Sequence, residues 1–181
     1  VDLTSHPEIR AAAAAIAAAP LERQEAGRRL LADRVAALER TVWQHELGHQ
    51  ALDAAGIVTG GMPGWFVEGL AQACETWTPE RPDLLANVNA RLVADFRARY
   101  PRPDDLPDLA VYVAAPPGDA VDRDYPVAWA LLHYLWHRQP PSLAGFVAAP
   151  RLAGGVTPVA ERATFARLSG PPDRALAAVL H

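Results

Sequence analysis

The chain has 181 residues, half of them hydrophobic and 21% charged, which is the length and composition of one globular domain with its own core. The formal net charge of −4 provides no attraction for nucleic acid or for an anionic membrane surface, so we expect neither partner. Cys74 is the only cysteine, which excludes an internal disulfide and a cysteine-rich metal site.

The N-terminal residues 1–34 are predicted to form a helical segment that does not insert into a membrane. No run of residues approaches the roughly 18 apolar positions that a spanning helix requires. Residues 11–19 are mostly alanine between Arg10 and Pro20, which favours an alanine-rich helix over the apolar part of a signal peptide. Because the sequence begins with Val1, we expect that upstream sequence has been removed; the cellular location therefore stays open, export included.

The central part of the chain is predicted to be a series of helices. Strong helix formers run over residues 21–53, with apolar residues at three- and four-residue steps, as in a long helix broken at most once. A glycine-rich loop at residues 60–64 precedes a second helix over residues 63–77. A third helix over residues 82–100 ends before Pro101.

The rest of the chain adds an irregular segment and more helices. Residues 101–124 hold five prolines, and their one strand-like piece is residues 111–113. Helices are predicted over residues 125–138, 142–149 with Ser142 as N-cap, 158–168 and 171–180. We therefore predict a mainly α fold with little or no β-sheet, in a single domain of three parts: residues 1–34, 35–140 and 141–181.

The residues that carry chemistry begin with His45-Glu46-Leu47-Gly48-His49. Positions four apart on a helix share a face, so both imidazoles can reach one zinc ion about 2.0–2.1 Å away. Glu46 would lie beside a zinc-bound water and take its proton as the water attacks a carbonyl. Gly48 costs about 1 kcal/mol of helix propensity relative to alanine, which indicates close approach of another group. The alternative is a solvated helix with two surface histidines.

Glu68, nineteen residues after His49, is the candidate third ligand. It belongs to the predicted helix with an apolar face, and packing that face beside the first helix would bring Glu68 towards the histidines and leave the fourth position open. The alternative is an ordinary surface glutamate. Gln72, one turn further, could accept the second N–H of a metal-bound histidine or be a polar surface residue, and Asp53 is a weaker candidate for that role.

Two other classes of zinc enzyme are excluded by the residues after the motif. Metzincins require a glycine three residues after the second histidine and a further histidine three residues later, where this chain has Leu52 and Ala55. The inverted H-x-x-E-H order is absent as well. Of these classes of zinc enzyme, the one that uses a glutamate as the third ligand remains.

These segments resemble the gluzincin clan of zinc metallopeptidases. Residues 45–50 and 63–71 are similar to the H-E-x-x-H and P-x-W-x-x-E-G-L-A helices of its largely bacterial peptidase-MA-like group, and residues 125–132 to a later helix of that group. The resemblance covers roughly residues 35–140. It implies a zincin-like core with the metal-binding helix and the glutamate helix adjacent. The ligands of one zinc ion would be His45, His49 and Glu68.

The resemblance also implies two catalytic roles. Glu46 would be the general base, and Tyr125 would donate to the oxyanion of the tetrahedral intermediate, a contact that contributes about 2.7–4 kcal/mol. Tyr112, Tyr134 and His133 compete for the second role, and Tyr125 can equally be a half-buried tyrosine at the start of a helix. His133 and His137 are four apart too and could make a second metal pair, but no acid stands at useful spacing, so we expect core or surface histidines there.

The sequence thus predicts a zinc-dependent peptidase or amide hydrolase acting on a peptide or small amide. Two alternatives stay open: a catalytically silent, zinc-stabilised binding or scaffold domain, and a biosynthetic zinc enzyme with a non-peptide substrate. Gluzincins usually have a small sheet before the metal-binding helix, whose edge strand holds an extended peptide. Residues 1–40 read as helical here, so either the sheet is lost or trimmed, which would change substrate choice, or the segment is not helical.

Overall fold

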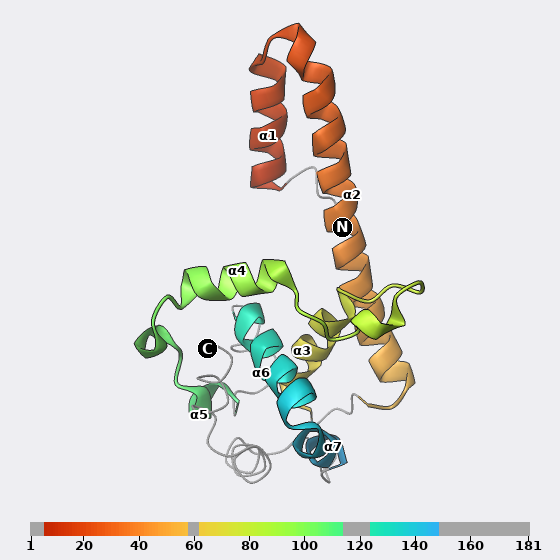
Figure 1. The fold of residues 1–181 in the computed structure, drawn as a ribbon, viewed down its shortest axis with the longest axis vertical. Helices are drawn as coiled ribbons and strands as arrows, with labels where there is room; N and C mark the ends of the chain where they lie inside the picture. Colours follow the sequence, from red (N-terminus) through yellow and green to blue (C-terminus); the bar gives the residue numbers. More distant parts are fainter. Residues whose placement is uncertain (1–5, 58–61, 114–123, 149–181) are drawn as a thin grey trace. The chain divides into compact units, whose positions relative to one another are not determined.

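The computed structural model describes residues 6–57, 62–113 and 124–148, which form a mainly α fold (Figure 1). Within these ranges no β-strand forms, apart from an isolated bridge between Thr78 and Arg81. The predicted fold class is therefore confirmed. No helix of the described residues is long and apolar enough to cross a membrane.

The chain divides into two compact units, and the first of them covers residues 1–44. It contains α1 (Pro7–Ala18) and the first part of α2 (Leu21–Ala54), which lie side by side as a helical hairpin (Figure 1). A proline begins α1, where its fixed φ suits the helix and its missing N–H has no partner to lose. The turn is held by Gln24 Nε2, which donates to the carbonyl of Ala19 at 2.9 Å. The prediction of a helical N-terminal segment is confirmed for these residues.

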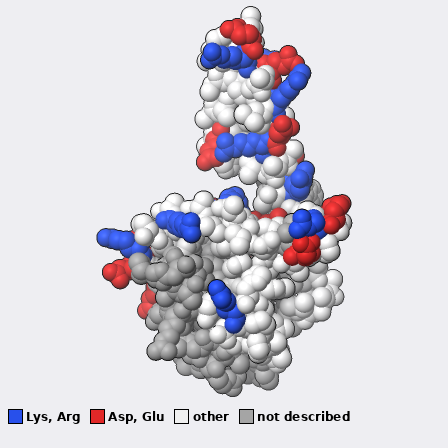
Figure 2. All heavy atoms as spheres, in the orientation of Figure 1, with Lys and Arg blue, Asp and Glu red and all other residues white. Residues whose placement is uncertain are grey.

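Acidic and basic side chains are interspersed over the surface of this first unit (Figure 2). Arg29 pairs with Glu25 one turn away, and Arg34 of α2 pairs with Glu8 of α1. All four side chains are more than half exposed, so each pair contributes little to stability.

The second unit, residues 45–181, begins within α2 and carries the remaining helices. These are α3 (Gly64–Cys74), η2 (Pro82–Leu84), α4 (Ala90–Arg99), η3 (Pro103–Asp105), α5 (Leu109–Tyr112), α6 (Tyr125–Arg138) and α7 (Pro140–Ala148).

The core of the second unit is built around α3 and α6, which lie beside each other (Figure 1). Most residues of both helices are buried. A Cβ at Gly69 would lie 2.8 Å from the carbonyl oxygen of Ala128, so glycine is what lets the two backbones come this close. Trp65 and Phe66 of α3 pack against Phe146 of α7, with ring centroids 5.5 and 5.0 Å apart. This contact adds α7 to the core.

The C-terminus of α2 is closed by a Schellman motif. Gly56 has φ +66, Ile57 N–H donates to Leu52 O at 3.0 Å, and Gly56 N–H donates to Asp53 O at 2.9 Å. Leu52 and Ile57 also pack against the core. The helix predicted over residues 21–53 is confirmed, and α2 runs to Ala54 without a break.

The largest difference between the predicted and the observed elements concerns the single helix expected over residues 82–100. Only η2 and α4 form there, because Ala86 adopts φ +57 between them and Asn89 caps α4 with its side chain. The second helix ends at Cys74, three residues earlier than expected. The strand-like piece at residues 111–113 was wrong, since Asp108 Oδ1 accepts from Val111 N–H and opens the short helix α5.

The last helices are confirmed only in part. The helix predicted over residues 125–138 matches α6 at both ends. The next helix begins at Pro140, so Ser142 lies inside α7 and is not its N-cap. The helices predicted over residues 158–168 and 171–180 lie outside the described residues.

Candidate metal centre

His45 and His49 lie one turn apart on the same face of α2, as their spacing predicts. Their Nε2 atoms are 3.1 Å apart and their ring centroids 4.8 Å. Both side chains are partly accessible, at 15% and 26% exposed. The two rings therefore present their Nε2 atoms to one point in space.

Glu68 of α3 completes the cluster. Its Oε2 lies 3.2 Å from His45 Nε2 and 3.6 Å from His49 Nε2. The expectation that packing α3 beside α2 brings Glu68 to the histidine pair is confirmed.

Gly48 explains how α3 comes near enough. A Cβ at this position would lie 3.1 Å from Ala71 Cα and equally close to the Cys74 side chain. Because Ala71 Cα is backbone, it cannot swing aside as a side chain would. The close approach that Gly48 predicts is thus present, and the helix it admits carries Glu68.

The spacing of the three atoms fits a tetrahedral metal. Ligand atoms about 2.0–2.1 Å from zinc in tetrahedral directions lie about 3.3 Å from one another. The three observed separations are 3.1, 3.2 and 3.6 Å. Among the residues that the structure describes, this is the group of histidine, cysteine, aspartate and glutamate ligands that could hold an ion.

The electrostatics of the cluster favour a positive charge at its centre. Burial by itself opposes charge on His45, but its contacts with Glu68 and Glu75 outweigh this and raise its pKa to about 9. Burial likewise opposes charge on Glu68, and the two imidazoles outweigh it and lower its pKa to about 2. Glu68 Oε2 is buried and accepts no hydrogen bond. A divalent cation would satisfy these groups together.

Glu75 is a partner of this site that the sequence reasoning missed. Its Oε1 lies 3.2 Å from His45 Nδ1, on the side of the ring away from the cluster. A signal was present, since Glu75 stands seven residues after Glu68, two helical turns along the same face. The expected partner, Gln72, is buried, but its amide oxygen has no hydrogen-bond partner, so the contact predicted for it is not formed. Asp53 is exposed at the end of α2.

Glu46 and Tyr125 are the candidate catalytic groups. Glu46 is exposed and adjoins His45 in α2. Tyr125 begins α6, is 38% exposed, and places its ring perpendicular to that of His45 with centroids 6.1 Å apart. Of the competitors, Tyr112 is buried and donates its hydroxyl to the carbonyl of Asp124. Tyr125 therefore lies beside the cluster, whereas the hydroxyl of Tyr112 is engaged by the backbone of Asp124.

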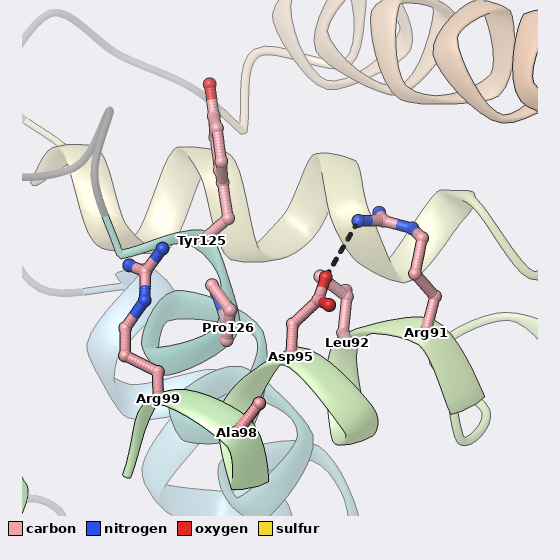
Figure 3. Close-up of a pocket in the computed structure, with 7 residues that line it drawn as sticks. All are labelled: Arg91, Leu92, Asp95, Ala98, Arg99, Tyr125 and Pro126. Carbon is pink, nitrogen blue, oxygen red and sulfur yellow. Dashed lines mark hydrogen bonds and ion pairs between the residues drawn. The ribbon is translucent and has the colours of Figure 1, made fainter. Parts of the chain in front are cut away.

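Asp124 anchors the start of α6. Its Oδ1 accepts from the guanidinium of Arg99 and from the hydroxyl of Tyr100, each at 2.6 Å. Because both donors belong to the end of α4, this anchor fixes where Tyr125 emerges. Tyr125 also lines a cavity of about 480 Å³ between α4 and α6, together with Arg91 and Arg99 at the two ends of α4 (Figure 3).

His133 and His137 meet at a backbone carbonyl. Their rings lie 4.4 Å apart, and each directs a nitrogen to Ala86 O, at 3.1 and 2.9 Å. Burial and the neighbouring His137 lower the pKa of His133. The pair thus supports the strained conformation of Ala86.

The fold and the site together define a mainly α protein with a candidate centre of two histidines and one glutamate. The chain belongs to the family described as "Protein of unknown function (DUF1570)", whose model matches residues 40–151, more than half of its length. All residues of the candidate centre fall within the match. Comparisons with curated proteins and with solved structures found no match.

Proposed function

We propose that this chain is a zinc-dependent peptidase or amide hydrolase of gluzincin type. The observation that carries the proposal is the spacing of His45 Nε2, His49 Nε2 and Glu68 Oε2, which suits three ligands of one tetrahedral ion. A histidine–histidine–glutamate set leaves one position open, as catalytic zinc sites do.

Zinc bound there would polarise a substrate carbonyl and lower the pKa of a water molecule. Glu46, next to His45, would take the proton of the attacking water and pass it to the leaving amine. The hydroxyl of Tyr125 would donate to the oxyanion of the tetrahedral intermediate. The cavity beside Tyr125 has a volume typical of small-ligand sites and would receive part of the substrate.

Substrate binding would differ from that of most gluzincins. Residues 7–18 and 21–44 are helical, so the described chain before His45 has no edge strand for an extended peptide. A short peptide or a small amide held in the cavity beside α4 fits this architecture.

The test is zinc analysis of the purified protein together with cleavage of a diverse peptide library, with and without chelator. We expect one zinc per chain and cleavage that the chelator abolishes. Glu46→Gln should keep its zinc and lose activity by about 10²–10⁴-fold, the range for removal of a general base. Glu80→Gln makes the same chemical change at an exposed position of the second unit and serves as the control.

His49→Ala should lose zinc as well as activity. A full zinc complement in His49→Ala would refute the ligand assignment, and unchanged activity in Glu46→Gln would refute the base. Zinc binding without any chelator-sensitive cleavage would instead favour the scaffold alternative or a non-peptide substrate.

A further inference from the structure

The carboxylate of Glu75 contacts three hydrogen-bonding groups of the second unit, one from α2 and two from the start of α4. Its Oε1 lies 3.2 Å from His45 Nδ1. Its Oε2 accepts from Asn89 Nδ2 at 2.9 Å and from Arg91 Nη2 at 2.8 Å. The Glu75 side chain is only 5% exposed, so these contacts replace its water. A buried carboxylate is tolerated when its oxygens are paired in this way.

The two donors on Oε2 are themselves fixed. Asn89 is 8% exposed and caps α4, since its Oδ1 accepts from Leu92 N–H at 3.3 Å. Arg91 lies in the first turn of α4 and also contacts Asp95. Glu75 is therefore held by the N-terminus of α4 and not only by its own place after α3.

This arrangement defines which nitrogen of His45 carries hydrogen. An ionised carboxylate only accepts, so Nδ1 must be the donor. In the neutral ring, Nε2 then carries the lone pair, and it faces His49 Nε2 and Glu68 Oε2. The ring is thus set for binding a metal through Nε2.

We propose that Glu75, anchored by Asn89 and Arg91, is a positioning residue that holds His45 in the tautomer and orientation required for metal binding, and so sets the metal affinity. This inference rests on the proposed metal centre. An amide cannot replace the carboxylate, because three donors converge on it and an amide has one acceptor oxygen.

The experiment measures the zinc dissociation constant of the full chain by competition with a chromogenic chelator. Glu75→Gln should weaken zinc binding by about 10–100-fold, as loss of an outer partner of a metal-bound histidine does. Arg91→Gln, which removes one donor to Oε2, should weaken it less. Asp83→Asn disrupts the exposed Arg81–Asp83 ion pair of the same unit, and as the matched control should leave the affinity unchanged.

A second measurement separates positioning from a general loss of stability. In ¹⁵N-edited spectra of the zinc-loaded wild type, we expect His45 to bind zinc through Nε2 and to show a protected Nδ1–H. In Glu75→Gln this proton should exchange rapidly with water, while the corresponding signals of His133 and His137 stay unchanged. If Glu75→Gln does not fold, Arg91→Gln, whose altered side chain is half exposed, is compared with Asp83→Asn in the same two measurements.

The outcomes distinguish this inference from the proposed function. A wild type that binds no zinc would overturn both. A wild type that binds zinc, with Glu75→Gln and Arg91→Gln equal to Asp83→Asn in affinity and in the Nδ1–H signal, would overturn the positioning role alone. Weaker zinc binding by Glu75→Gln together with loss of the protected His45 Nδ1–H signal would support the positioning role.

Discussion

At the scale of single residues, the candidate centre depends on side chains whose atoms are placed within a few tenths of an ångström of metal-ligand spacing. Two imidazoles and a carboxylate converge there with no hydrogen bond to satisfy Glu68 Oε2. The carboxylate of Glu68 favours a positive charge at the centre of this cluster. A metal ion held by the three groups would supply that charge.

Tyr125 provides a prediction at this scale. Tyr125→Phe should lower kcat by about 10²–10³-fold, since it removes one donor to the oxyanion, and should leave zinc content unchanged. The measurement is steady-state hydrolysis of the best library peptide. Tyr134→Phe, on the same helix but packed against the core, is the control. Equal activities of the two variants would assign the oxyanion donor elsewhere.

The sequence predicts most of this residue-scale picture. His45, Glu46, His49 and Glu68 follow from helical spacing and metal chemistry, and the close contact at Gly48 follows from its poor helix propensity. The spacing from Glu68 also puts Glu75 on the same face, but the sequence does not show that Asn89 and Arg91 hold its carboxylate. These two contacts depend on tertiary packing, which spacing within one helix does not report.

At the scale of elements, glycines set how near the helices come. Gly48 lets α3 approach α2, and Gly69 lets α3 approach α6. The position of Glu68 therefore depends on contacts on two sides of its helix.

Gly69→Ala should destabilise the protein. In an open helix this change stabilises by about 1 kcal/mol, but here the new methyl group would meet the carbonyl oxygen of Ala128 at 2.8 Å. Overpacking of this kind costs about 1–3 kcal/mol. Urea denaturation measures the free energy of unfolding. An increase in this free energy would show that α3 and α6 do not make the close contact at Gly69.

Gly48→Ala should weaken zinc binding as well as stability. The added Cβ would press on the backbone of α3 at Ala71, three residues from Glu68. A shift of α3 moves Glu68 away from both histidines. The zinc dissociation constant, measured by the same chelator competition, should rise; an unchanged value would mean that the helices adjust without moving the ligand.

The differences between predicted and observed elements have physical causes. The helix expected over residues 82–100 is interrupted because Ala86 turns its carbonyl to His133 and His137 of α6. These long-range hydrogen bonds outweigh local helix propensity. Residues 111 and 112 of the strand-like piece are helical because Asp108 caps a turn there. Both causes lie outside the segments themselves.

At the scale of the whole molecule, the helical class follows from abundant helix formers punctuated by proline and glycine. The family match begins at residue 40, shortly before His45, and covers the core that α3 and α6 form. The sequence predicts that the glutamate helix lies beside the histidine helix, but the packing of α3 against α6 emerges only from the structure.

Zinc should stabilise the whole fold, since its ligands come from two helices. Free zinc at about 1,000 times its dissociation constant raises the free energy of unfolding by about 4.1 kcal/mol. For a protein of this size, each change of about 1 kcal/mol shifts Tm by about 2–4 °C. Calorimetry should therefore show that Tm falls by about 8–16 °C when a chelator removes the zinc. The Tm of His49→Ala should not change with chelator. If the Tm of the wild type did not change either, the result would argue against the zinc site.

The most direct test of the zinc site is X-ray absorption at the zinc edge of the protein loaded with one equivalent of zinc. We expect nitrogen and oxygen ligands at about 2.0–2.1 Å, with the scattering of two imidazole rings. Zinc–sulfur scattering at about 2.3 Å, which would implicate Cys74, or the absence of imidazole scattering would contradict it.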